Sequence, residues 1–161
     1  MTIKKYITLL LLSGISLISC KQNSTGEMAS EKTYAIRLKP GMDLKKSIQS
    51  FINEKKLHAA WIATCAGSLT NYSIRFANQP KADTGSGHFE IVSLTGTLSD
   101  NGSHMHISIS DSTGRTIGGH LQEGCIIYTT AEIVIQSTNK LLFKRAKDGT
   151  TPWEELQIEE K

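Results

Sequence analysis

Three histidines in the second half of the chain, His104, His106 and His120, have the type and spacing of a metal-ligand set. Neutral imidazoles are common ligands of zinc and other divalent ions, and three of them leave a coordination position open. Water or a small anion can fill that position, and a zinc-bound water with a pKa of about 7 supports hydrolysis or hydration. The sequence therefore predicts a divalent metal site, provided that the three side chains meet.

The residues between these histidines predict a β-hairpin. Apolar and polar side chains alternate on both sides of a break at Asp111-Ser112-Thr113-Gly114, which is the pattern of two strands and a tight turn. A glycine at the third loop position suits a three-residue loop in which Gly114 adopts the left-handed conformation. Asp111 then pairs with Arg115, which sets the alignment of both strands.

In this register His106 lies opposite His120, Ile109 lies opposite Ile117, and His104 is diagonally adjacent to His120. A slip of one residue would send His120 to the other face and would also separate the two isoleucines. The apolar pattern and the histidine cluster thus favour the same pairing. The alternatives to a metal site are a solvated polar face, an anion site and a contact with a partner subunit.

The N-terminus has the pattern of a bacterial lipoprotein signal peptide. Residues 1–19 contain Lys4 and Lys5, an apolar run, and Leu17-Ile18-Ser19 directly before Cys20. The apolar run is shorter than the roughly 20 residues that cross a bilayer as a helix. We therefore expect cleavage before Cys20, lipidation of Cys20, and a protein anchored by lipid to a membrane of the bacterial cell envelope.

Removal of this signal changes what the composition implies. Of 161 residues, loss of 19 leaves 142, with a flexible polar tether over residues 20–32 and one domain over residues 33–158. The signal takes two of the 18 basic residues and none of the 15 acidic ones, so 16 remain against 15. Such a near-neutral chain argues against a nucleic-acid-binding surface, which needs clustered basic side chains.

The rest of the chain predicts one main helix and many strands. Leu44, Ile48, Phe51 and Ile52 recur at helical spacing. The strands are expected at residues 34–39, 59–66, 72–76, 89–98, 126–136 and 141–145, in addition to the hairpin. This pattern indicates an α/β fold of the α+β type, with a single mainly antiparallel sheet covered by the helix.

Two cysteines remain once Cys20 is set aside. Cys65 and Cys125 both lie in apolar, strand-like segments, so we expect buried free thiols. A disulfide between them stays open, because the sequence does not say whether the sulfurs meet.

Six motifs, taken in order, resemble the plant and prokaryote conserved (PPC) domain family. The resemblance implies a compact domain with one sheet and a helix, assembled as a homotrimer. It also implies that three histidines which hold a metal such as zinc in some prokaryotic members are matched by His104, His106 and His120. The motifs are Tyr34-Ala-Ile-Arg-Leu with Gly41-Met-Asp-Leu, Gly67-Ser-Leu before Ile74-Arg75, Gly87-His-Phe-Glu-Ile-Val-Ser-Leu-Thr-Gly96, His104-Met-His106 to Asp111, Gly118-Gly-His-Leu-Gln-Glu-Gly124, and Thr130-Ala-Glu132.

Plant relatives in this family join the domain to AT-hooks that bind DNA. This chain has no Arg-Gly-Arg-Pro hook, and His88 stands where the plant relatives carry arginine. DNA binding by family analogy is therefore disfavoured, since export and a near-neutral charge both oppose it.

Two functions follow from these observations. The first is a membrane-tethered metal-binding protein with a small anionic ligand at the open position and, as an extension, zinc-dependent hydrolase or hydratase chemistry. Candidate helpers are Arg75, Glu90 and Glu132, as general base or anion clamp, although such residues on strands also form structural ion pairs or subunit contacts. The second is a trimeric ligand-binding or scaffold module without catalysis.

Overall fold

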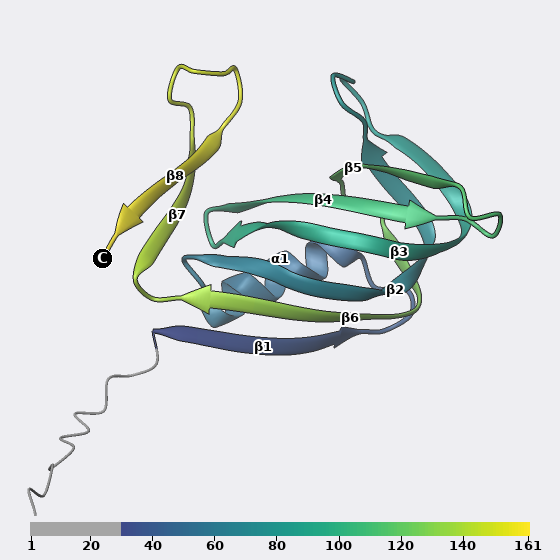
Figure 1. Cartoon of the computed structure of the whole chain (residues 1–161), viewed down its shortest axis with the longest axis horizontal. Helices are drawn as coiled ribbons and strands as arrows, with labels where there is room; N and C mark the ends of the chain where they lie inside the picture. Colours follow the sequence, from purple (N-terminus) through teal and green to yellow (C-terminus); the bar gives the residue numbers. More distant parts are fainter. Residues whose placement is uncertain (1–29) are drawn as a thin grey trace, which may run out of the picture.

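The computed structural model describes residues 30–161, so the expected signal peptide, Cys20 and the tether up to residue 29 lie outside the described residues. Figure 1 shows one helix against a curved sheet, with a small hairpin at the C-terminus. The elements, in chain order, are β1 (Glu31–Leu38), α1 (Leu44–Lys55), β2 (Ala60–Arg75), β3 (Asp83–Ser99), β4 (Gly102–Ser110), β5 (Thr116–Leu121), β6 (Ile126–Thr138), β7 (Leu141–Ala146) and β8 (Glu155–Glu160).

The main sheet has six strands in the order β1-β6-β2-β3-β4-β5, and all its pairings are antiparallel. The end of β2 also pairs with β5, where Arg75 lies opposite His120. This contact closes the β2–β5 part of the sheet at one end, because the edge strand β5 meets the end of β2 (Figure 1). The predicted α+β fold, a mainly antiparallel sheet with one main helix, is confirmed.

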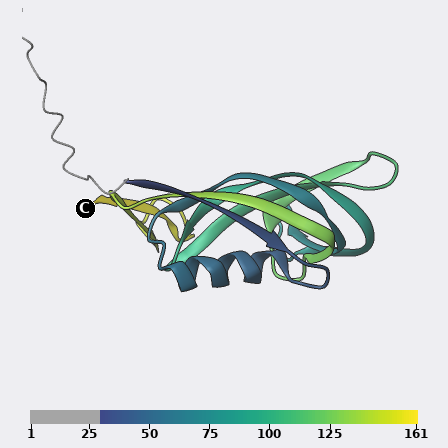
Figure 2. The ribbon, with the colours of Figure 1, turned by 90° about the horizontal axis from the view of Figure 1, so that it is seen from below.

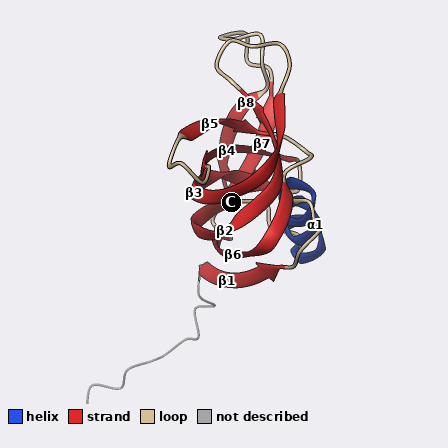
Figure 3. Cartoon of the chain, turned by 90° about the vertical axis from the view of Figure 1, so that its right-hand side faces the viewer, coloured by secondary structure: helices blue, strands red, loops and turns tan. Residues whose placement is uncertain are grey.

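Helix α1 covers one face of the sheet, as Figures 2 and 3 show from two sides. Its predicted apolar stripe is buried, with Leu44, Ile48 and Ile52 each 0% exposed. The carboxylate of Asp43 caps the helix by accepting a hydrogen bond of 3.0 Å from the Lys46 amide. The same carboxylate accepts a bond of 2.7 Å from the Gly124 amide, so the cap also holds the loop that follows β5.

Several details differ from the expected elements, and one is that β3 begins at Asp83 rather than at residue 89. The two strands expected at residues 59–66 and 72–76 form the continuous strand β2, because register shifts between Gly67 and Asn71 let it bend without breaking its pairing. Strand β1 begins at Glu31, which pairs with Thr138, two residues before the expected start of the domain at residue 33. The expected end at residue 158 falls inside β8, a strand that the polar C-terminal sequence did not predict.

Strands β7 and β8 form a separate two-stranded sheet. The Phe143 amide attaches it to the main body through a hydrogen bond of 2.9 Å to the carbonyl of His58. No helix within residues 30–161 has the length and hydropathy needed to cross a membrane.

Candidate metal centre

The hairpin that carries the histidines has the predicted register. Strands β4 and β5 pair His106 with His120 and Ile109 with Ile117. The turn has the expected form, because Gly114 adopts a φ of +83° and its amide donates to the Asp111 carbonyl at 3.0 Å.

The Asp111 side chain also stabilises this turn. Its Oδ1 atom accepts hydrogen bonds from the Thr113 amide at 2.8 Å, the Thr113 hydroxyl at 2.6 Å and the Arg115 amide at 3.1 Å. These bonds to the charged form lower the pKa of Asp111 below its ordinary value of 3.8, with the Thr113 hydroxyl as the largest cause.

The three histidines meet on the sheet face opposite the helix. Their neighbours on β4, Met105 and Ile107, point into the core and are 3% and 2% exposed, so alternation turns His104 and His106 to the other side. The Nδ1 atom of His120 lies 3.1 Å from Nε2 of His104 and 3.2 Å from Nε2 of His106. Each histidine offers one ring nitrogen as a metal ligand, and these three nitrogens all lie within 4.8 Å of one another.

This spacing fits a bound metal. Tetrahedral zinc with bonds of about 2.0–2.1 Å to nitrogen places its ligand atoms roughly 3.4 Å apart, close to the two distances from His120 Nδ1. That nitrogen has one in-plane lone pair when the ring is neutral, so it cannot accept two well-aligned hydrogen bonds from His104 and His106. A shared cation would satisfy all three nitrogens together.

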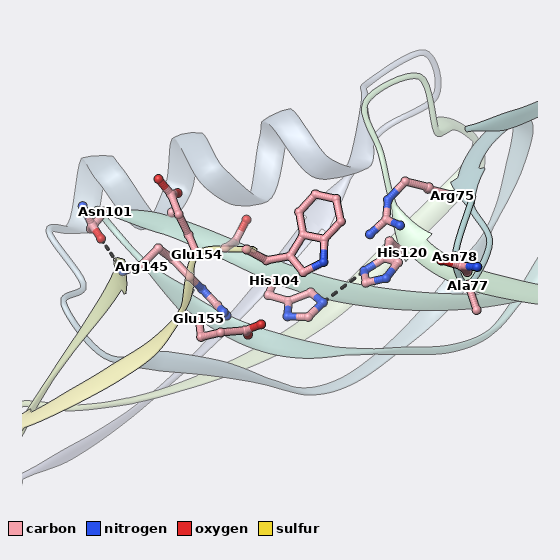
Figure 4. A pocket seen from close by; sticks show the side chains of 12 residues that line it. Arg75, Ala77, Asn78, Asn101, His104, His120, Arg145, Glu154 and Glu155 are labelled. Atoms are coloured by element: carbon pink, nitrogen blue, oxygen red, sulfur yellow. Dashed lines mark hydrogen bonds between the residues drawn. The ribbon is translucent and has the colours of Figure 1, made fainter. Parts of the chain in front are cut away.

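The surroundings favour the neutral imidazoles that a metal requires. Partial burial lowers the pKa of His104 below its ordinary value of 6.5, and the guanidinium of Arg145 lowers it further. Partial burial also lowers the pKa of His120, and there the nearby positive charge is Arg75. Figure 4 shows Arg75 beside His120 and Arg145 on the other side of His104.

The position of His120 depends on a close approach between β5 and β2. A Cβ atom added to Gly119 would lie 2.6 Å from the carbonyl oxygen of Arg75 and 3.0 Å from Cγ2 of Ile74. Only glycine lets the two backbones come this close, so Gly119 sets the pairing between Arg75 and His120.

Of the three candidate helpers, Arg75 alone lines the pocket at the histidines. Glu90 lies near the other end of the hairpin, opposite Ser110, and its side chain is exposed. Glu132 lies on β6 opposite Arg37, and β2 and β3 separate that strand from β4. The structure thus places both carboxylates outside the pocket that contains His104 and His120.

The pocket has a volume of about 570 Å³ and includes residues that sequence reasoning missed. They belong to β7, β8 and the loop between them, which Figure 4 shows beside the histidines. They lie in a polar C-terminal segment without a regular alternation of apolar and polar residues. The sequence therefore does not predict that they lie near the histidine hairpin. The missed residues include Arg145, Trp153, Glu154 and Glu155, and Asn78 and Asn101 also line the pocket.

Fold and site together define a small α+β domain with a three-histidine cluster on the open face of its sheet. The chain belongs to the family described as the Plants and Prokaryotes Conserved (PCC) domain, whose model matches residues 25–139. The resemblance to this family, also abbreviated PPC, is confirmed. The match ends before the β7–β8 hairpin.

Curated relatives contain the domain as one part of longer proteins. The chain is 41% identical over 130 residues to the bifunctional protein GlmU of Synechococcus sp. (strain JA-3-3Ab), covering 81% of the chain and 21% of that protein. It is 27% identical over 116 residues to the AT-hook motif nuclear-localized protein 13 of Arabidopsis thaliana, covering 65% of the chain and 26% of that protein. The chain therefore spans about a fifth to a quarter of the length of these relatives.

Solved structures share the fold. A hypothetical protein from Salmonella cholerae-suis superposes with a TM-score of 0.80 at 39% identity, covering 81% of this chain and 95% of that one. A protein from Archaeoglobus fulgidus described as metal-containing has a TM-score of 0.67 at 26% identity, covering 78% of this chain and 93% of that one. A PPC protein from Pyrococcus horikoshii has a TM-score of 0.61 at 29% identity, with coverages of 78% and 93%.

Proposed function

We propose that this protein binds one divalent metal ion, with zinc as the expected metal, through His104, His106 and His120. The observation that carries the proposal is the approach of two Nε2 atoms to within 3.1 and 3.2 Å of His120 Nδ1. The description of the Archaeoglobus fulgidus structure as a metal-containing protein supports it. When bound, zinc acts as a Lewis acid and lowers the pKa of a coordinated water.

The chain's own residues prepare the site for such an ion. Partial burial lowers the pKa of His104 and His120, and the guanidiniums of Arg145 and Arg75 lower it further, which favours the neutral imidazoles that bind a metal. The register of β4 and β5 supports the proposal as well, because it brings the backbone positions of His106 and His120 opposite each other.

Metal analysis tests the proposal on the purified full chain. The His106→Ala variant removes one ligand, and His88→Ala is the matched control, because His88 stacks on Tyr128 with ring centroids 4.2 Å apart and lies outside the cluster. About one zinc per chain in the wild type and in His88→Ala, and its loss from His106→Ala, is the expected result. A metal-free wild type whose thermal stability does not change on adding zinc would contradict it.

A binding or scaffold role without catalysis is the second candidate. It is favoured by the positions of Glu90 and Glu132, which lie outside the pocket and so cannot act within one chain as general bases at the histidines. Metal content alone does not separate the two, so turnover of hydrolysable esters by zinc-loaded protein, compared with His106→Ala, distinguishes catalysis from binding.

The proposed location is the bacterial cell envelope, with the domain held to a membrane by a lipid on Cys20. Support comes from the order of basic residues, apolar run and Leu17-Ile18-Ser19-Cys20 in the sequence. Expression in a bacterium with labelled palmitate should give a labelled membrane-bound protein, and Cys20→Ser should abolish the label. An unlabelled wild type that stays in the cytoplasm would overturn this part of the proposal.

The proposed assembly is a homotrimer, as the family resemblance implies, and nucleic acid is not an expected partner. Light scattering on the mature protein tests the first statement, and a monomeric mass would contradict it. Retention on DNA at low salt tests the second, because phosphate binding by basic side chains is strongest there.

A further inference from the structure

The pocket at the histidines contains two arginines whose guanidinium groups have no acidic partner. Arg75 donates a hydrogen bond of 3.4 Å to the carbonyl of Gln79, and Arg145 donates one of 2.6 Å to the Thr97 hydroxyl. In the described part of the chain, residues 30–161, no carboxylate oxygen lies within 4.0 Å of either group. Each guanidinium has five N–H donors, so most of them remain free.

Within residues 30–161 no nearby carboxylate forms an ion pair with these arginines, although the charge of Glu155 partly opposes the lowering of the Arg145 pKa by burial. Glu155 lines the pocket, but its Oε1 atom accepts a hydrogen bond of 2.7 Å from the Thr151 hydroxyl. Glu154 is exposed at the rim. Figure 4 shows Arg75 at the His120 end of the pocket and Arg145 at the other end, beyond His104.

An apolar surface lies next to the charged groups. The Cζ atom of Arg75 is 5.7 Å from the centroid of the Trp153 ring, a cation–π distance. The Trp153 side chain is nevertheless 65% exposed, so most of its ring is free to contact a ligand. A large exposed aromatic beside unpaired donors is typical of a small-molecule site.

We propose that this pocket binds a small molecule through one oxyanion, a carboxylate or a phosphate held by Arg75, with the apolar part of the molecule against Trp153 and with Arg145 attracting the anion from the other end of the pocket. Planar guanidiniums match the geometry of both oxyanions. The carboxylates of Glu154 and Glu155 repel a polyanion, so a ligand with a single anionic group fits better than a nucleic-acid backbone. The inference deepens the proposed function, because His104 and His120 line the same pocket.

The two arginines come from different parts of the chain. Arg75 is the last residue of β2 and is positioned by its pairing with His120. Arg145 lies on β7, where its backbone amide donates a hydrogen bond to Oδ1 of Asn101. The β7–β8 hairpin therefore supplies both the second guanidinium and the aromatic surface.

Tryptophan fluorescence gives a direct test, because the chain contains two tryptophans. The other, Trp61, lies on β2 and donates a hydrogen bond of 3.1 Å to Gln136. In a Trp61→Phe background Trp153 becomes the sole tryptophan, and its emission should change on titration with phenyl phosphate or with benzoate. Both probes offer a ring to Trp153 and differ in the oxyanion, so they distinguish phosphate from carboxylate recognition.

Arg75→Gln should weaken binding of the preferred probe by about tenfold or more, the usual effect of losing a charged hydrogen bond. Arg145→Gln, at the other end of the pocket, should weaken it less, because only a longer-range attraction is lost. Arg115→Gln is the matched control, since Arg115 lies in the hairpin turn outside the pocket. If Trp61→Phe does not fold, calorimetric titration of the wild type replaces fluorescence. No binding of either probe at millimolar concentration, or equal weakening by all three substitutions, would overturn the proposal.

All titrations are made on metal-free and on zinc-loaded protein. Binding to the metal-free protein that depends on the arginines supports the oxyanion site even if zinc never binds. Zinc binding without any probe binding supports the metal centre and overturns the oxyanion site. The two proposals can thus fail separately.

Discussion

His106 and His120 are a directly opposed pair in neighbouring strands, and their Nε2 and Nδ1 atoms lie 3.2 Å apart. The strand that carries His120 is held from both sides, by β4 in the hairpin and by the end of β2 at Arg75. The geometry of the candidate metal centre therefore depends on backbone features that can be altered without touching a histidine.

The hairpin turn is the first such feature. Gly114→Ala places a Cβ at a φ of +83° with no atom within 4 Å to clash with it, so the cost is backbone strain of about 1 kcal/mol. Gly114→Asn should lose less, because asparagine tolerates the left-handed conformation. Urea unfolding should give the order glycine, asparagine, alanine from most to least stable, and equal stabilities would refute a left-handed requirement.

The contact between β2 and β5 is the second backbone feature on which the metal centre depends. Gly119→Ala forces a Cβ to within 2.6 Å of the Arg75 carbonyl oxygen, so the strands must separate at a cost of roughly 1–3 kcal/mol. Because His120 moves with β5, we also expect weaker zinc binding, measured by competition with a chelator. Gly87→Ala is the control, since its Cβ meets only the Phe89 ring, at 3.2 Å. Unchanged zinc affinity in Gly119→Ala would show that this pairing does not position the site.

The Asp111 carboxylate predicts a pH dependence of stability. Hydrogen bonds, first of all from the Thr113 hydroxyl, lower its pKa in the folded state below the ordinary 3.8. The folded state thus favours the charged form, and the contribution is fully present above pH 3.8 and is lost as the pH falls through the folded pKa. The difference in melting temperature between wild type and Asp111→Asn should be constant near neutral pH and shrink below pH 3.8. Parallel curves down to pH 2 would contradict this assignment.

The two described cysteines should be unreactive in the native protein. Both are free and buried, as predicted from their apolar segments, and burial raises the pKa of each thiol to about 11. Alkylation requires the thiolate, which is then scarce at pH 8. Mass spectrometry of Cys20→Ser protein treated with iodoacetamide should show little labelling of Cys65 or Cys125 until denaturant is added. Rapid labelling of the folded protein would argue against this burial.

Much of the fold and the centre of the candidate site could be predicted from local patterns. The β4–β5 register follows from alternation around Gly114, since a slip would have exposed Ile109 and Ile117. Helix α1 follows from the spacing of Leu44, Ile48 and Ile52 in the same way. In both cases the residues that determine the structure are near neighbours in the chain. Their spacing in the sequence is therefore enough to predict which side chains share a face.

The surroundings of the histidines were decided by tertiary structure alone. Arg75 reaches His120 because β2 bends and its end pairs with β5, and Arg145 and Trp153 reach the same pocket because the β7–β8 hairpin packs beside it. Glu90 was equally plausible from sequence, yet strand order and register place it away from the cluster. Contacts between segments far apart in the chain depend on how the sheet curves and closes, and no local periodicity encodes that curvature.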